Sequence, residues 1–268
     1  MALTNYGLSQ TVKVMTYNLR YDNPDDGLNS WDSRKVLIAN QVSRIAPDFL
    51  GTQEGLNNQV RYLSETLKNY SFVGVGREDG VEKGEYAAIF YRSDRYKVIK
   101  SSTFWLSATP DVHSVGWDAA LERICTYGLF QNIKTGKRCW IFNTHLDHIG
   151  KIARKESAKL ILERINQLNV DNYPVILTGD FNSEETDEPI VVIKAKLFDT
   201  FYNQRGSKRT PKPTFNGFNL NEPAKERIDY IFINQSKAKV KSHITLNDLV
   251  DNRYPSDHFP VVSVIKFK

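Results

Sequence analysis

The chain has 268 residues, of which 40% are hydrophobic and 25% are charged, a mix typical of a globular protein with a sizeable core. Its 36 Lys and Arg residues against 31 Asp and Glu residues give a formal net charge of +5, a modest excess that favours anionic partners. The absence of any run of 18 apolar residues excludes a membrane span, and the N-terminal residues lack the basic and apolar regions of a signal peptide. These features leave the compartment open, and we expect a monomer.

Segments typical of strands and helices alternate along the first half of the chain. A strand is predicted over 12–20, a helix over 30–47 that Pro47 ends, a short buried strand over 48–54 and a second helix over 58–70. Five strands are predicted next, over 70–76, 85–92, 96–106, 122–133 and 138–148.

The second half begins with a basic helix over 151–168 and a buried strand over 175–182. The following stretch, 203–226, is irregular and rich in Pro, Asn and Lys, and its basic part, 206–219, is either a solvated loop or a loop that faces the substrate. Three strands close the chain, over 227–234, 239–246 and 259–267. Because strands outnumber helices, we predict one domain over 1–268, with two mixed sheets packed together and helices outside.

The two cysteines lie on the strands of a predicted hairpin that turns at Thr135 and Gly136. This register places Cys125 opposite Leu146 rather than opposite Cys139. A disulfide requires Cα atoms that lie close together, so we expect two free thiols.

Polar side chains stand at the ends of several apolar runs. They are Asn18, Glu54, Asn143, His145, Asp147, His148, Asp180, Asn182, Asp229, Asp257 and His258. Because ligand sites in α/β sheets lie where strands end, these side chains are expected to meet at one rim. Each residue alone also has a simpler explanation, as a turn former, a solvated acid, a surface ion pair or a satisfied half-buried histidine.

The stretch GDFN carries Asp180 and Asn182, which would point to the same side of an extended chain. Either a cation or a substrate lies between the two side chains, or they start a turn. The whole polar set is rich in carboxylate and amide oxygens and has no cysteine, which favours magnesium, manganese or calcium over zinc. Together with an imidazole that titrates near neutrality, such a set suits the hydrolysis of phosphate esters.

Six motifs occur in one order along the chain: TYNLR, GTQE, NTHLDH, GDFN, RIDYIF and SDH. They span residues 16–258 and resemble the endonuclease/exonuclease/phosphatase superfamily, with most likeness to its deadenylase-type branch. The resemblance implies a four-layer α/β sandwich of the deoxyribonuclease I type, in which helices flank two packed mixed β-sheets. It also implies a Mg²⁺ or Mn²⁺ cofactor and a phosphate-ester substrate.

The resemblance implies a role for each matching residue. Glu54 would be the main metal ligand, with Asn18 beside it, and Asp257 would lie near the metal directly or through water. Asp180 would align or deprotonate the attacking water, and Asn182 would orient that water or a phosphate oxygen.

Two histidines are expected to face the phosphate. His258 would act as a base or as a donor to the transition state, with Asp229 fixing its tautomer. His145 resembles the second phosphate-facing histidine of the superfamily, and Glu85 resembles a carboxylate that supports this histidine.

Three further residues are predicted to bind substrate. Arg123 would pair with a phosphate, and Asn143 lies on the strand that carries His145. Trp117 would stack on a base or a sugar, or else it packs a loop.

Three functions remain open from the sequence. The first is a metal-dependent phosphodiesterase or nuclease acting on nucleic acid, which the basic balance and the aromatic loops favour. The second is a phosphatase or phosphodiesterase for a small substrate such as an inositol phosphate or a sugar phosphate. The third is a non-catalytic binding protein on the same scaffold, against which the intact motifs argue.

Overall fold

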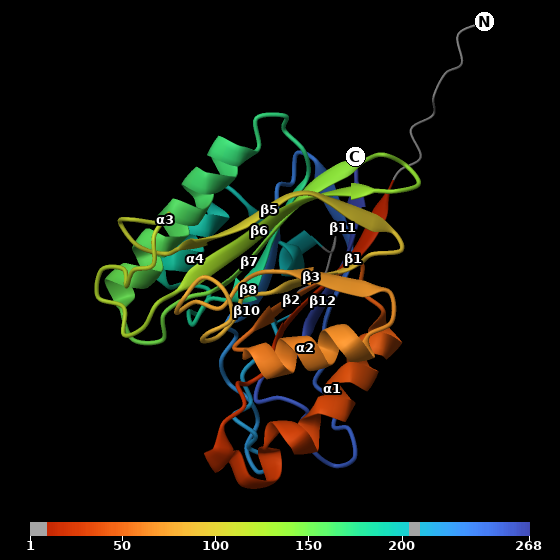
Figure 1. Cartoon of the computed structure of the whole chain (residues 1–268), viewed down its shortest axis with the longest axis vertical. Helices are drawn as coiled ribbons and strands as arrows, with labels where there is room; N and C mark the ends of the chain where they lie inside the picture. The colour runs from red at the N-terminus through yellow and green to blue at the C-terminus, as the bar shows by residue number, and fades with distance from the viewer. Residues whose placement is uncertain (1–9, 204–209) are drawn as a thin grey trace, which may run out of the picture.

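A computed structural model describes residues 10–203 and 210–268, and its strands form two mixed six-stranded sheets packed face to face (Figure 1). The first sheet has the order β11-β12-β1-β2-β4-β3, with β1 (Thr11–Asn18), β2 (Phe49–Gln53), β3 (Tyr70–Val73), β4 (Ile89–Arg92), β11 (Ala238–Thr245) and β12 (Val261–Phe267). The second has the order β5-β6-β7-β8-β10-β9, with β5 (Tyr96–Trp105), β6 (Ile124–Asn132), β7 (Arg138–His145), β8 (Val175–Asp180), β9 (Phe198–Asp199) and β10 (Asp229–Ile233).

Helices cover the outer face of each sheet, so the predicted four-layer α/β sandwich is confirmed (Figure 1). The first sheet is covered by α1 (Trp31–Ile45) and α2 (Asn57–Thr66), and the second by α3 (Lys151–Leu168) and α4 (Glu188–Lys194). Two short 3₁₀ helices, η1 (Pro24–Asn29) and η2 (Thr200–Asn203), lie in connections. None of the helices in the described part of the chain is both long and apolar enough to cross a membrane.

The alternation of side chains along the central strands explains how one face builds both a core and a site. On β1, Val12 and Val14 pack between the two sheets, and the same face continues to Asn18 at the strand end. On β8, Ile176 packs between the sheets, and its face continues to Asp180. On each of these strands, the face that points between the sheets therefore carries apolar core residues first and a polar residue at the strand end.

Asn143 of β7 connects the two sheets. It pairs with Thr178 of β8, which lies between the buried Ile176 and Asp180 at the rim. Its Nδ2 donates to the carbonyls of Thr52 (2.8 Å) and Ala88 (3.0 Å), and its Oδ1 accepts from Gln53 Nε2 (2.7 Å) and Thr178 Oγ1 (3.0 Å). The side chain is fully buried, and these four bonds use its whole hydrogen-bonding capacity. Asn143 is therefore a polar connection between β7 of the second sheet and the strands of the first.

The sheets approach closely at this connection because Gly51 of β2 has no side chain. A Cβ atom at Gly51 would lie 2.4 Å from Thr178 Oγ1 and 2.5 Å from Asn143 Oδ1, well inside van der Waals contact. Any larger residue at position 51 would push the second sheet away, so glycine here is required by close approach rather than by backbone conformation.

Replacing Asn143 by Ala is expected to lower the free energy of unfolding by about 2–4 kcal/mol, because buried carbonyls and amides lose their partners. Chemical denaturation at one pH measures the change. Asn58→Ala is a matched control, since Asn58 is exposed and, among the described residues, its side chain donates to that of Asp22 at 2.8 Å, so its loss is expected to cost below about 0.5 kcal/mol. Equal effects of the two substitutions would contradict the structural role of Asn143.

Both cysteines are free and buried, so the predicted absence of a disulfide is confirmed. The predicted register of the hairpin is wrong by two residues, because Cys125 pairs with Thr144 rather than with Leu146. The reason is a longer turn. Asn132 accepts from two turn amides through its Oδ1, and the turn spans 133–136 instead of two residues.

The helix α4 lies in a segment for which the sequence predicted no element. It has seven residues, too few for a helix stable by itself, and forms because Ile190 and Ile193 are buried against the second sheet. Within the predicted irregular stretch, the described residues 210–226 form no helix or named strand, and residues 204–209 lie outside the described structure.

Candidate active site

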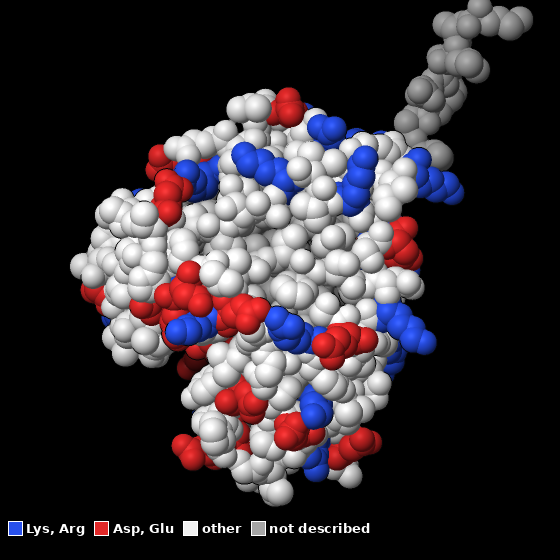
Figure 2. Space-filling view, in the orientation of Figure 1, with Lys and Arg blue, Asp and Glu red and all other residues white. Residues whose placement is uncertain are grey.

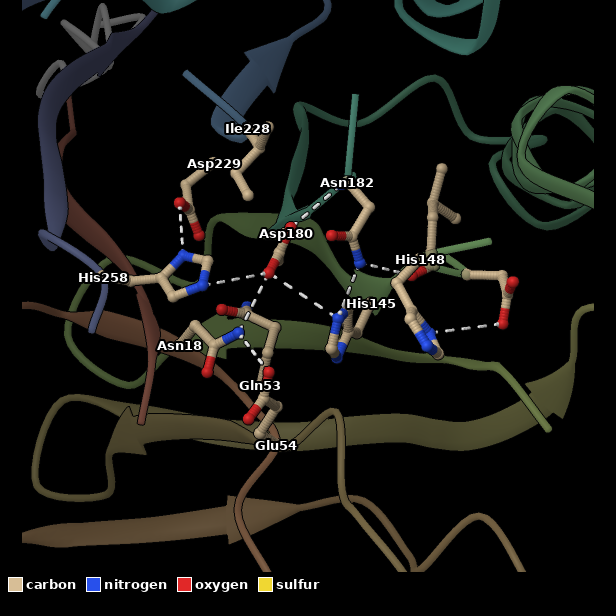
Figure 3. Close-up of polar contacts among 12 residues, drawn as sticks. Asn18, Gln53, Glu54, His145, His148, Asp180, Asn182, Ile228, Asp229 and His258 are labelled. Atoms are coloured by element: carbon tan, nitrogen blue, oxygen red, sulfur yellow. Dashed lines mark hydrogen bonds and ion pairs between the residues drawn. The ribbon is translucent and has the colours of Figure 1, made fainter. Parts of the chain in front are cut away.

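The polar ends of β1, β2, β7 and β8 and the start of β10 meet at one rim, as expected from parallel strands (Figure 3). They surround a cleft of about 610 Å³. Eight of the predicted site residues line the cleft: Glu54, Glu85, Arg123, His145, Asp180, Asn182, Asp257 and His258.

Asp180 is at the centre of this arrangement (Figure 3). Its Oδ2 accepts from Asn18 Nδ2 at 2.9 Å and lies 3.7 Å from His258 Nε2 and 3.6 Å from His145 Nε2. Asn18 Nδ2 also donates to Glu54 Oε1 at 2.9 Å. One ligand atom each from Glu54, Asp180 and His258 lies within 4.8 Å of the others, so both sheets contribute to one polar group.

Two of these side chains, those of Glu54 and Asn182, are directed into the cleft by residues with left-handed backbone conformation. Glu54 follows β2 with a φ of 62°, which breaks the strand alternation, and its carboxylate meets Asn18 and the backbone amide of Tyr21 at 3.1 Å. Asn182 has a φ of 45°, a conformation that asparagine tolerates. Its backbone N–H donates to Asp180 Oδ1 at 2.9 Å, so the GDFN stretch makes a turn and also lines the cleft.

His258 is buried against Asp229 at the start of β10. Its Nδ1 lies 2.9 Å from Asp229 Oδ2, and since a carboxylate can only accept, the ring nitrogen donates. Burial lowers the pKa of His258, but the negative charges of Asp229 and Asp180 outweigh it and hold this pKa well above its usual value. The ring is therefore set to present a protonated Nε2 toward Asp180 and the cleft.

His145 has the opposite character. Burial and the positive charge of Arg123 lower its pKa to about 4, so the ring is neutral near pH 7. Asn182 Nδ2 donates to the carbonyl of Leu146 at 2.9 Å and meets His145 Nε2 at 3.0 Å, which makes Nε2 the acceptor. The ring proton is thus on Nδ1, which lies 3.7 Å from Glu85 Oε2.

Asp257 lies at the edge of the Glu54–Asp180–His258 group. Its Oδ2 is 3.9 Å from Arg20 Nε. Burial, with a contribution from Glu54, raises the pKa of the Asp257 carboxyl to about 6, and burial also raises the pKa of Asp180. Crowded, desolvated carboxylates of this kind are stabilised by a cation, and their hard oxygens match a divalent ion, so these residues fit a metal site.

Two predicted substrate contacts lie elsewhere. Asn143 does not line the cleft, because its side chain is buried between the sheets with every bond satisfied. Trp117 is 42% exposed and lines a separate hollow with Lys159 and Arg164 of α3. In contrast, Arg123 does line the cleft, where its Nη2 lies 2.9 Å from His148 Nδ1.

The cleft wall also contains residues for which the sequence predicted no individual role, although His148 was among the polar residues expected at the rim. They include Arg20, Tyr21, Arg77, His148 and Phe215. Arg20 ends the TYNLR motif and His148 ends NTHLDH, so motif membership is a signal for both. Arg77 and Phe215 come from loops without a pattern, although Phe215 belongs to the basic stretch 206–219 and packs edge-on against His258 with ring centroids 5.0 Å apart.

Comparisons with known proteins agree with this arrangement. The model of the Endonuclease/Exonuclease/phosphatase family matches residues 15–258. A family member of known structure from Bacteroides thetaiotaomicron is 40% identical, with a TM-score of 0.91, covering 97% of this chain and 99% of its own. A mannosyl-6-phosphatase from the same bacterium is 41% identical, with a TM-score of 0.89, covering 95% of this chain and 99% of its own.

The human nocturnin catalytic domain has the same fold at 20% identity, with a TM-score of 0.77 and 97% coverage of both chains. The fold and the polar cleft define a phosphoester hydrolase of a class that depends on divalent metal ions. The chain belongs to the Endonuclease/Exonuclease/phosphatase family.

Proposed function

We propose that this protein is a Mg²⁺- or Mn²⁺-dependent phosphatase that removes phosphate from a small sugar phosphate. The observation that carries the proposal is the cleft, whose volume of about 610 Å³ suits one small ligand. Its likeness to a mannosyl-6-phosphatase, at 41% identity over 95% of the chain, supports the same substrate class.

The residues around Asp180 have a chemistry that suits this reaction. A divalent cation held by Glu54 and Asp180 would supply positive charge to neutralise the phosphate. The Asp180 carboxylate, fixed by Asn18 and by the Asn182 amide, accepts the proton of the attacking water or aligns it. These hydrogen bonds hold the acceptor in place before substrate arrives.

The two histidines act differently in this proposal because their protonation differs. His258, kept protonated by Asp229, donates from Nε2 to a phosphoryl oxygen and stabilises the charge that builds there. His145 is neutral, and its ring separates the phosphate end of the cleft from Glu85.

A second candidate function is a phosphodiesterase or nuclease acting on nucleic acid. The observation that favours it is the net charge of +5, with Arg20, Arg77 and Arg123 all lining the cleft. Against it, Figure 2 shows basic and acidic side chains interspersed on the face in view, without a continuous basic track for a polyanion.

A substrate panel tests both functions. Purified protein with MgCl₂ or MnCl₂ is given hexose 6-phosphates, p-nitrophenyl phosphate, bis-p-nitrophenyl phosphate, inositol phosphates, single-stranded RNA and duplex DNA. We expect the highest kcat/KM with a hexose phosphate, and loss of turnover when the protein is treated with chelator. The Asp180→Ala variant is the blank.

Each other outcome of the panel has a definite meaning. Faster cleavage of RNA or DNA than of any monoester would replace the sugar phosphatase by the nuclease. Absence of turnover with every substrate and either metal would contradict both and favour a binding protein.

A further inference from the structure

A second polar group lies in the cleft wall on the far side of His145 from Asp180. It consists of Arg77, Glu85 and Arg123, hereafter the Arg77–Glu85–Arg123 group. Arg77 Nη1 donates to Glu85 Oε2 at 2.7 Å, and Arg123 Nη1 lies 4.0 Å from the same oxygen. All three residues line the cleft.

Three buried donors of this group and of the adjacent His145 have no hydrogen-bond partner among the described residues. They are Arg77 Nε, Arg123 Nη1 and the Nδ1 of His145. The three residues are only 7%, 5% and 8% exposed, so bulk water cannot easily satisfy these atoms. Buried donors left without partners are costly, and in a cleft wall they indicate groups that a ligand completes.

The group is held rigidly by its surroundings. Trp105 Nε1 donates to the carbonyl of Arg77 at 2.8 Å, and the backbone N–H of Arg77 donates to the carbonyl of Glu85 at 3.1 Å. Arg123 Nε meets Asp147 Oδ2 at 3.3 Å, which fixes the guanidinium from behind. The first two bonds fix the backbone of Arg77, and its side chain is held by the bond from Nη1 to Glu85. Side chains held in place before binding lose little conformational entropy when a ligand binds.

The charges of the group favour a neutral polar ligand over a second anion. Two guanidinium groups are offset by two carboxylates, those of Glu85 and Asp147. The polar contacts of the Glu85 carboxylate among the described residues all go to Oε2, so Oε1 remains able to accept. A phosphate group could only accept and would be repelled by Glu85, whereas a hydroxyl group both donates and accepts.

We propose that the Arg77–Glu85–Arg123 group binds hydroxyl groups of the sugar while the phosphate occupies the Asp180–His258 end of the cleft. This proposal rests on the proposed function and names the part of the molecule that recognises the sugar. The two ends are separated by one imidazole ring, since His145 lies 3.6 Å from Asp180 through Nε2 and 3.7 Å from Glu85 through Nδ1. One small ligand therefore reaches both.

The first test uses the wild-type protein with its metal. Steady-state kcat/KM is measured for a hexose 6-phosphate and for the series of its single-deoxy analogues. Removal of the hydroxyl that contacts the group is expected to lower kcat/KM by about 10–100-fold, because charged partners are left unpaired. The analogues lacking other hydroxyls are expected to change much less.

The second test asks whether Arg77 causes this discrimination. In Arg77→Met, the ratio of kcat/KM for the hexose phosphate to that for p-nitrophenyl phosphate is expected to fall about 10–100-fold, mainly through KM. The penalty for the critical deoxy analogue is expected to shrink by a similar factor. Arg61→Met is the matched control, because the exposed Arg61 pairs with Glu82 outside the cleft, and this variant is expected to keep the wild-type ratio.

The outcomes separate the two proposals. If the wild type hydrolyses p-nitrophenyl phosphate but no sugar phosphate, the proposed function and the hydroxyl subsite both fail. If sugar phosphates are substrates but every deoxy analogue matches its parent, the subsite alone is refuted. A loss in Arg77→Met that is equal for both substrates also refutes it, and if this variant does not fold, the wild-type deoxy series decides.

Discussion

Replacement of His258 by Gln is expected to lower kcat/KM for every phosphate ester that the protein hydrolyses by about 10²–10⁴-fold. The imidazole is held by Asp229 at 2.9 Å with its pKa raised, so it presents a positive donor where phosphoryl charge develops. The glutamine amide can still donate a hydrogen bond from a side chain of similar length, but it has no positive charge. Steady-state kinetics with p-nitrophenyl phosphate measures the loss, and thermal unfolding checks that the variant is folded.

Asp229→Asn tests the effect of Asp229 on the His258 imidazole, because it leaves the imidazole in place. The imidazole remains in this variant, but its tautomer and its positive charge are no longer enforced. We expect a smaller fall in kcat/KM than for His258→Gln and an unchanged affinity for Mg²⁺, because Asp229 contacts Nδ1 of His258 and is not part of the group formed by Glu54, Asp180 and His258. Activity of His258→Gln within tenfold of wild type would remove this histidine from the mechanism.

The second large effect is expected from Glu54→Gln. This change removes one negative charge from the group that Glu54 forms with Asp180 and His258, while the side chain keeps its size. We expect the affinity for Mg²⁺ or Mn²⁺ to fall by about 100-fold or more, and turnover at a fixed low metal concentration to fall with it. Isothermal titration calorimetry measures the affinity directly.

Glu188→Gln is the control for this experiment, because Glu188 is a surface carboxylate that pairs with Lys155 at 2.7 Å and is remote from the cleft. Its metal affinity is expected to equal that of the wild type. Unchanged metal binding by Glu54→Gln would show that the cation lies elsewhere, and higher metal concentrations that restore its turnover would support the role of Glu54.

The convergence of Asn18, Asp180 and His145 could be predicted from the sequence because it depends on short-range pattern. Each ends an apolar run with a period of two, and parallel strands bring their carboxyl ends to the same edge. The polar character of the strand ends, and the hard oxygen chemistry that follows from it, required no knowledge of the tertiary structure.

The depth of a residue along its strand could not be predicted in the same way. Asn143 and His145 lie on one face of β7 and look equivalent in sequence, but only His145 reaches the rim, while Asn143 lies two residues deeper between the sheets. The difference depends on how closely the sheets approach at Gly51, which is a property of packing.

The positions of loop residues relative to the cleft could not be predicted either. Arg77 reaches the cleft because its loop is fixed by Trp105 from β5, a contact between segments 28 residues apart. Trp117 lies in another loop, which opens beside α3. Composition marks such loops as exposed and polar, but their direction is set by long-range contacts that no local pattern encodes.

The polar group around Asp180, which is the proposed cation site, takes Asn18 and Glu54 from one sheet and Asp180 from the other. Its geometry is therefore only as exact as the alignment of the two sheets, which the Asn143 bonds and the missing side chain at Gly51 fix. A sideways slip of one sheet by a fraction of an ångström would change the distances from Asp180 to Asn18 and Glu54 without breaking any hydrogen bond within either sheet. Substitutions at the contact between the sheets, around Asn143 and Gly51, should therefore weaken metal binding in protein that is still folded.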